Sequence, residues 1–249
     1  MQPLYDMHCH LDFAEDGLAA AQDMTAAGAG AFSATVTPDG YRIASEAFAT
    51  HMDVRVGVGL HPWWVADGTC GSDSLEQVLS YIDETPFVGE VGLDFGKKHG
   101  TLCTEQTLAF DKIIGRCARL GGKVITIHSV KAASQALDIL EAHKATGSCA
   151  CILHWYSGPT DQLWRAIDMG CYFSVGAFMV RTGRGKEYAK LIPPELLLLE
   201  TDEPPAQTSY SFLAMQQQMT EVLDTLEQIK GVPLRETIGA TSRKLLNLG

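Results

Sequence analysis

Six side chains of the types that bind divalent metals stand at or near the ends of predicted strands. They are His8, His10, Glu90, His128, His154 and Asp202. A lone histidine in a strand is more often a satisfied polar group than a ligand, and an aspartate after a strand is often a helix cap. Burying six such groups without partners would cost on the order of several kcal/mol in total. Their convergence therefore predicts a metal site.

The spacing of the first two histidines supports this prediction. Side chains at positions i and i+2 of a strand point to the same side, so His8 and His10 face one way and Cys9 faces the other. Imidazole nitrogens and carboxylate oxygens are ordinary zinc ligands, and mixed sites of this kind also accept manganese or magnesium. Glu90 has two oxygens and can bridge two ions. We expect two or three divalent cations (Zn²⁺, Mg²⁺ or Mn²⁺), which would activate a water for attack on a phosphoryl or carbonyl group.

Apolar, β-prone runs alternate with helix-like stretches along the chain. The predicted strands are Leu4–His10, Ala31–Val36, Val54–Gly59, Phe87–Leu93, Lys123–His128, Ala150–His154, Cys171–Val175 and Leu196–Thr201. The predicted helices are Leu18–Ala27, Ile43–Thr50, Ser74–Glu84, Glu105–Leu120, Ala132–His143, Thr160–Asp168, Gly185–Leu191, Phe212–Lys230 and Leu234–Leu246. Alternating βα units predict a parallel sheet whose strands are buried on both faces.

Eight such repeats in 249 residues favour an α/β protein with a single closed (β/α)₈ barrel, a TIM barrel, and its metal site at the C-terminal ends of the strands. An open doubly wound sheet would need a glycine-rich phosphate loop after its first strand. The sequence there reads Asp6-Met7-His8-Cys9-His10 instead. We predict one domain that spans residues 1–249.

Composition narrows the class of protein further. A hydrophobic fraction of 46% is that of a globular chain with a large core. Residues 1–10 lack the pattern of a signal peptide, and no apolar run is long enough for a membrane span, so we expect a cytoplasmic protein. The seven cysteines contain no Cys-x-x-Cys pair, which favours reduced thiols. The net charge of −11 opposes broad electrostatic capture of nucleic acid, but bound metals would supply local positive charge.

Several motifs, in order along the chain, resemble those of the TatD-like deoxyribonucleases, a family of the metal-dependent hydrolase superfamily. They are Asp6-Met7-His8-Cys9-His10-Leu11-Asp12, Gly59-Leu60-His61-Pro62, Gly89-Glu90-Val91-Gly92-Leu93-Asp94-Phe95 with Gln106 and Phe110, Ile127-His128-Ser129, His154-Trp155-Tyr156-Ser157-Gly158 and Leu199-Glu200-Thr201-Asp202. The resemblance implies that the six side chains named above are the metal ligands. It also implies that Glu90 is shared between ions, that Asp202 handles the proton of the attacking water, and that DNA ends are attacked as by a 3′–5′ exonuclease.

The chain departs from the family pattern at three places. Val130 and Lys131 stand where the family usually has an arginine soon after the His-Ser motif. Glu203 replaces a small residue after Asp202, and Trp155-Tyr156 replaces a Cys-Phe pair. A missing guanidinium and an added carboxylate both weaken phosphate binding, although Lys131 can partly substitute as a point charge.

Further residues are candidates for substrate contacts. His61 follows the third strand and either contacts a phosphate or shapes the loop. Trp63, followed by Trp64, either stacks on unpaired bases or packs within its loop. Arg181 and Arg184 belong to the most basic loop, which is either a phosphate clamp or a solvated segment. Among the other polar residues, Asp6 either supports a ligand or pairs with a cation at the barrel floor, and His99 is expected on the surface.

Three functions remain open from the sequence. The leading one is hydrolysis of DNA from free 3′ ends of single strands, with the faces of Trp63, Trp64, Trp155 and Tyr156 available to terminal bases. The same metals would polarise a carbonyl, so a hydrolase of esters or amides, such as an aminoacyl-ester deacylase, is the enzymatic alternative. A metal-binding, non-catalytic subunit of a larger assembly is the third.

Overall fold

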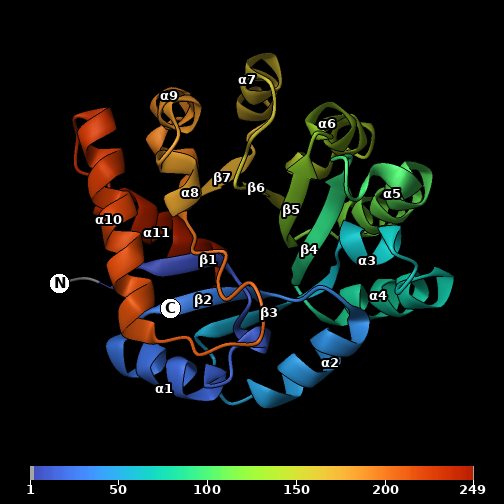
Figure 1. Ribbon diagram of the computed structural model, residues 1–249, viewed down its shortest axis with the longest axis horizontal. Helices are drawn as coiled ribbons and strands as arrows, with labels where there is room; N and C mark the ends of the chain where they lie inside the picture. Colours follow the sequence, from blue (N-terminus) through green and yellow to red (C-terminus); the bar gives the residue numbers. More distant parts are fainter. Residues whose placement is uncertain (1–2, 249) are drawn as a thin grey trace. The chain divides into compact units, whose positions relative to one another are not determined.

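A computed structural model describes residues 3–248, so residues 1, 2 and 249 of the predicted domain lie outside the described part. Its strands form one eight-stranded sheet in the order β1 to β8, which is the order of a (β/α)₈ barrel (Figure 1). The strands are β1 (Tyr5–Cys9), β2 (Gly30–Ala34), β3 (Val54–Leu60), β4 (Phe87–Asp94), β5 (Val124–Val130), β6 (Ala150–His154), β7 (Tyr172–Val175) and β8 (Leu197–Leu199).

Helices separate the strands. They are α1 (Gly17–Ala27), α2 (Pro38–Ala47), α3 (Pro62–Ala66), α4 (Ser72–Glu84), α5 (Cys103–Leu120), α6 (Ala133–Ala142), α7 (Thr160–Asp168), α8 (Ala177–Val180), α9 (Gly183–Leu191), α10 (Phe212–Lys230) and α11 (Arg235–Leu245). Short 3₁₀ turns are η1 (Leu11–Phe13), η2 (Gly100–Leu102), η3 (Ala145–Gly147) and η4 (Pro194–Leu196). None of the helices within residues 3–248 is both long and apolar enough to cross a bilayer.

Most elements agree with the sequence prediction, but two helix starts differ for one reason. Helix α2 begins at Pro38 rather than Ile43, and α3, which begins at Pro62, was not predicted. Proline is favoured in the first turn of a helix, where its missing N–H costs nothing. The preceding residues cap these turns, because Thr37 Oγ1 accepts from the Gly40 N–H and His61 Nδ1 accepts from the Trp63 N–H. The hydrophobic period alone does not reveal these capped starts.

The described residues divide into two compact units. The first contains the described residues up to Ser33, the segment Ile43–Val56 and the described residues from Phe173 onward. Here β1 pairs in parallel with β2, and β7 pairs in parallel with β8. Helix α10 packs against α8 and α9, as the orange helices of Figure 1 show.

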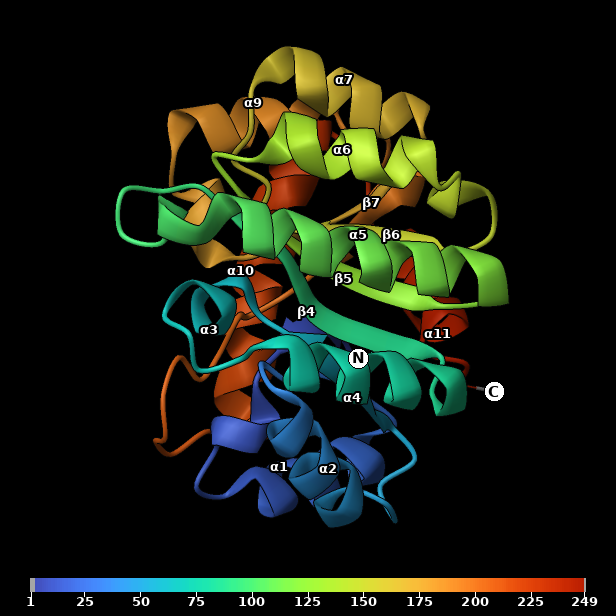
Figure 2. The same cartoon turned by 90° about the vertical axis from the view of Figure 1, so that its right-hand side faces the viewer.

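The second unit contains Ala34–Arg42 and Gly57–Tyr172. Strands β3, β4, β5 and β6 pair in parallel, and every residue of β4 is buried, as expected for a strand covered on both faces. Helix α5 lies across β4, with α4 on one side and α6 on the other (Figure 2).

Gly92 of β4 allows the close approach of two strands in this unit. It lies opposite His128 of β5 and has a φ of 144°, a conformation that side chains rarely tolerate. A Cβ atom at this position would lie 2.1 Å from the His128 carbonyl oxygen. The absence of a side chain at Gly92 therefore permits the close approach of the strands that carry Glu90 and His128.

Candidate metal centre

Three imidazoles of the second unit converge on one carboxylate oxygen. Glu90 Oε1, on β4, lies 2.8 Å from His128 Nδ1, 2.9 Å from His154 Nε2 and 3.1 Å from His61 Nε2. His128 belongs to β5, His154 is the last residue of β6, and His61 follows β3 as the cap of α3. All four side chains are buried. Neighbouring parallel strands thus bring donors of the zinc-binding types to one point.

Asp94, the last residue of β4, supports this cluster. Its Oδ2 atom accepts a hydrogen bond of 2.5 Å from the indole N–H of Trp63 and lies 3.2 Å from His128 Nε2. Burial raises the pKa of Asp94, but the hydrogen bonds from His128, Trp63 and the Gly96 N–H outweigh it and hold the pKa well below its usual range. Burial lowers the pKa of His128, yet Asp94 and Glu90 raise it to about 9.

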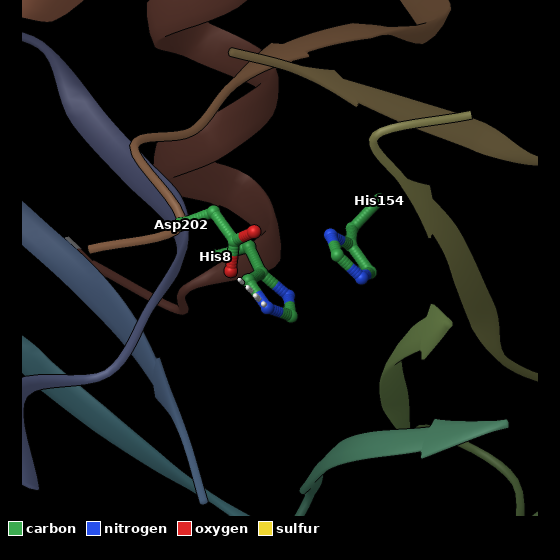
Figure 3. Close-up of side chains that lie close together, drawn as sticks. All are labelled: His8, His154 and Asp202. Carbon is green, nitrogen blue, oxygen red and sulfur yellow. Dashed lines mark ion pairs between the residues drawn. The ribbon is translucent and has the colours of Figure 1, made fainter. Parts of the chain in front are cut away.

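The first unit contributes two histidines and an aspartate. His8 Nε2 lies 3.5 Å and His10 Nε2 lies 3.4 Å from Asp202 Oδ1, so the ring on β1 and the ring directly after β1 reach the same carboxylate, as their spacing predicts. Figure 3 marks the ion pair between His8 and Asp202 with a dashed line and also draws His154 at the end of its own strand. The Asp202 N–H donates to the His8 carbonyl at 2.9 Å.

Asp202 is held in an unusual backbone conformation by its neighbours. It has a φ of 57°, which is uncommon for a residue other than glycine and typical of functional sites. Asp6 Oδ1 accepts from the backbone N–H groups of His8 and Thr201, and Asp6 Oδ2 accepts from the Thr201 hydroxyl at 2.5 Å. Burial raises the pKa of Asp6 to about 6 against these hydrogen bonds. Of the two interpretations of Asp6, these contacts favour support of the ligand-bearing segments.

Comparisons with known proteins place this geometry in a family. The model of the family described as TatD related DNase matches residues 5–248. The chain belongs to the TatD related DNase family. It is 25% identical over 178 residues to a human protein named deoxyribonuclease TATDN3, with 70% of this chain and 64% of that protein covered. It is 30% identical over 154 residues to the 3′-5′ ssDNA/RNA exonuclease TatD of Klebsiella pneumoniae, with 59% and 56% covered.

Solved structures show the same fold. The chain resembles YJJV, a TatD homologue of Escherichia coli, with a TM-score of 0.75 at 22% identity and coverage of 99% and 98%. It resembles a TatD family hydrolase of Entamoeba histolytica with a TM-score of 0.78 at 14% identity and coverage of 98% of each chain. The predicted (β/α)₈ barrel is confirmed. The matched regions span between about 56% and 64% of the curated relatives described above.

The donor set of this TatD family member fits divalent cations. In the second unit, His61, Glu90 and His128 each offer one ligand atom, and these atoms lie within 4.8 Å of one another. Buried imidazole nitrogens beside a carboxylate oxygen are the ligands of zinc and of manganese sites. The first unit offers the same chemistry with His8, His10 and Asp202.

The structure also revises the predicted surroundings of the ligands. His61, predicted to contact a phosphate or shape a loop, is buried, and its two ring nitrogens contact Glu90 and the Trp63 N–H. Asp94 belonged to a recognised motif, but the sequence assigned it no role. His99, predicted on the surface, is only partly exposed, because its ring stacks on Trp63 with centroids 4.4 Å apart.

The aromatic faces predicted to meet terminal bases differ in accessibility. Trp63 is 38% and Trp155 is 40% exposed, but Tyr156 is only 2% exposed. The Tyr156 hydroxyl donates to the Pro159 carbonyl, and this hydrogen bond holds the buried ring against the turn after β6. The prediction that Tyr156 offers a face to a base is therefore wrong.

The predicted cationic contacts lie on both units. Lys131 directly follows β5, is exposed, and has a φ of 55°. The Arg181 guanidinium lies 5.5 Å from the Phe178 ring centre. Arg184 Nε donates to the Tyr188 hydroxyl at 2.7 Å, and its guanidinium lies 5.1 Å from the Tyr188 ring centre. Tyr188 thus engages Arg184 within helix α9.

Proposed function

We propose that this chain is a divalent-metal-dependent hydrolase that cleaves phosphodiester bonds at the 3′ ends of single-stranded DNA. The observation that carries the proposal is the convergence of three imidazoles on Glu90 Oε1, together with the pair of histidines on Asp202. Membership of the TatD related DNase family supports it. Two or three ions of Zn²⁺, Mg²⁺ or Mn²⁺ are proposed, with six ligands: His8, His10, Glu90, His128, His154 and Asp202.

The six proposed ligands lie in or after strands β1, β4, β5, β6 and β8, and the active sites of barrels form at the carboxyl ends of the strands. When bound, divalent cations lower the pKa of water and neutralise charge on a phosphoryl group. Glu90 would be the shared ligand, because it has two oxygens and three imidazoles already lie at one of them. Asp202, whose side chain is 22% exposed, accepts the proton of the attacking water.

The substrate assignment has separate support. The human relative is named a deoxyribonuclease, and the Klebsiella relative a 3′-5′ ssDNA/RNA exonuclease. A net charge of −11 opposes tracking along a duplex, which needs a long basic surface. The exposed faces of Trp63 and Trp155 suit unstacked bases, which bind aromatic rings without regard to sequence. The catalytic domain of residues 1–249 and a cytoplasmic location remain predictions.

Oligonucleotides with blocked ends test this function. Metal-loaded protein should shorten a 5′-labelled single strand stepwise, leave a 3′-blocked strand intact, and spare a circular single strand. The matched control is Asp202→Asn loaded with the same metal, which should show none of these activities. Equal cutting of circular and linear strands would contradict the exonuclease assignment.

Glu203 favours a second candidate, the hydrolase of esters or amides. Glu203 follows Asp202 and is half-buried, and its backbone carbonyl accepts from the His10 N–H at 2.8 Å, so its backbone is held beside the ligands. A negative charge there disfavours a polyanion but not a neutral ester. A panel of aminoacyl esters and N-acyl amides, assayed beside the oligonucleotides, separates the two candidates. Turnover of the esters alone would select the second.

A further inference from the structure

We propose that Asp94 and Trp63 are positioning residues that fix the ring of His128 so that Nδ1 is its metal-binding nitrogen, and that they link metal binding to the exposed indole of Trp63. This inference rests on the metal centre of the proposed function but not on its substrate. The three residues belong to one compact unit, and two hydrogen bonds join them.

The first step concerns the proton on His128. Asp94 Oδ2 lies 3.2 Å from His128 Nε2, and an ionised carboxylate only accepts hydrogen bonds. The other ring nitrogen, Nδ1, also faces a carboxylate oxygen, Glu90 Oε1 at 2.8 Å. Glu90 is a proposed metal ligand and Asp94 is not, so a cation would be held on the Nδ1 side and the ring proton would stay on Nε2, where Asp94 accepts it. A carboxylate behind an imidazole in this way fixes its tautomer and raises its basicity as a ligand.

The second step is the fixed orientation of Asp94. Its Oδ1 atom accepts from the Gly96 N–H at 2.8 Å. Its backbone is held by Gln106 of α5, because Gln106 Oε1 accepts from the Asp94 N–H and Gln106 Nε2 donates to the Asp94 carbonyl. The carboxylate therefore cannot turn away from His128 without breaking several hydrogen bonds. Asp94 is a rigid support.

The third step is the attachment of Trp63. Its indole N–H donates to Asp94 Oδ2 at 2.5 Å, and its backbone N–H donates to His61 Nδ1. His99 stacks on the indole at an interplanar angle of 13°, and Gln106 Nε2 holds the His99 carbonyl at 2.8 Å. The ring is thus oriented by three neighbours while 38% of the residue stays exposed.

This arrangement connects Trp63 to the proposed metal ligand His128 on one side and to any ligand that contacts its exposed ring on the other. Loss of its N–H removes one of the two hydrogen bonds to Asp94 Oδ2, which loosens the support of His128. A ligand that moves the exposed ring acts through the same contact. The change that metal binding makes at His128 should therefore reach the indole N–H of Trp63.

The first experiment measures Zn²⁺ affinity by competition with a chelator in the full chain. Trp63→Phe keeps a flat ring and removes the N–H, and should weaken binding by about 3-fold to 10-fold. Asp94→Asn should weaken it by about 10-fold to 100-fold, the range for residues that support a ligand. The control is Trp164→Phe, an exposed tryptophan of α7, which should leave affinity unchanged. Affinities within twofold of the parent for both Trp63→Phe and Asp94→Asn would overturn the proposal.

A double variant tests whether the two residues act along one path. If Trp63 acts only through Asp94, Trp63→Phe should add little to the effect of Asp94→Asn. Full additivity would show separate effects and contradict the link. Thermal unfolding checks that each variant folds; if Asp94→Asn does not, Trp63→Phe alone decides the outcome.

The second experiment follows the indole N–H resonances of the four tryptophans by NMR during titration with Zn²⁺. The resonance that Trp63→Phe removes should shift on metal binding, whereas that of Trp164 should not. No substrate is present, so a protein that fails to cut DNA would refute the proposed function while leaving this test intact. A Trp63 resonance that stays fixed at metal saturation would refute the link.

Discussion

Glu90, His128 and His154 lie within strands of the second unit, whereas Asp202 of the first unit lies three residues beyond the end of β8. The strand-borne residues contact one another directly through their side chains. Asp202 contacts His8 and His10 through its side chain, but its position also depends on a backbone hydrogen bond to His8, and its φ is positive. Its side chain is 22% exposed, against 3% for Glu90.

This difference separates two tasks. A metal needs several donors at fixed distances, and adjacent parallel strands supply them because their register is set by backbone hydrogen bonds. A proton acceptor must also meet water, which the buried interior of a strand excludes. Glu90 therefore suits metal binding, and Asp202 suits proton transfer. The following predictions test this division.

Glu90→Gln should have the largest effect. The amide keeps the size of the side chain but loses the negative charge on which three imidazoles converge. We expect metal affinity to fall by more than about 100-fold, beyond the range for residues that only support ligands, and activity to fall with it. Elemental analysis after loading and desalting measures the metal. Retention of a full complement of metal would refute the central place of Glu90.

Asp202→Asn should instead lower turnover while leaving most of the metal bound. An amide cannot take a proton from water, so kcat should fall by about 100-fold or more. Most of the metal should remain, because the cluster around Glu90 does not contain Asp202. Single-turnover kinetics at saturating metal measures the chemical step. A variant with more than about a tenth of the parent kcat would contradict proton transfer by Asp202.

The sequence alone predicted where the side chains on strands, and at their ends, would lie. Apolar runs such as Cys151-Ile152-Leu153 reveal buried strands, and a histidine at their end is visible without coordinates. The structure places His154 at the end of β6 as predicted. His8 and His10 share a partner because a strand has a period of two.

Contacts between residues far apart in the sequence, or set by the geometry of a turn, could not be predicted in this way. The proposed role of Asp94 requires Gly92 to lie opposite His128 and Gln106 to hold the backbone at the end of β4. Neither condition follows from local patterns. Tyr156 was wrongly predicted to be exposed, because its burial depends on the turn in which its hydroxyl donates to the Pro159 carbonyl. Long-range pairing, rather than local propensity, sets these positions.

Thr201→Val should have a smaller effect, confined to the first unit. The substitution keeps the shape of the side chain but removes the hydroxyl that donates to the buried Asp6. We expect the free energy of unfolding to fall by about 1–3 kcal/mol and kcat to fall severalfold, because Asp202 is the next residue. Denaturant unfolding and steady-state kinetics measure both. Thr201→Ser, which retains the hydroxyl, should behave like the parent, and equal losses in both variants would exclude the hydrogen bond as the cause.

The smallest effects should come from the exposed cations, one on each unit. Lys131 follows β5, and Arg181 lies beside the Phe178 ring. If both contact the phosphates of a single strand, each alanine variant should weaken binding of a metal-loaded, inactive Asp202→Asn protein by about 2-fold to 5-fold at low salt.

Salt dependence distinguishes such contacts from loss of structure. Each phosphate contact that is removed should lower the slope of log affinity against log salt by about 0.7 for a single strand. Arg184→Ala should change the slope less, because Tyr188 already engages its guanidinium. Lys112→Ala, on the outer helix α5 beside Glu76, is the control with no expected change. Fluorescence anisotropy of a labelled oligonucleotide measures the affinities between low and moderate salt. If Lys131→Ala alone lowers the slope, the strand contacts the cation of the second unit, and Arg181 and Arg184 of the first unit are solvated side chains.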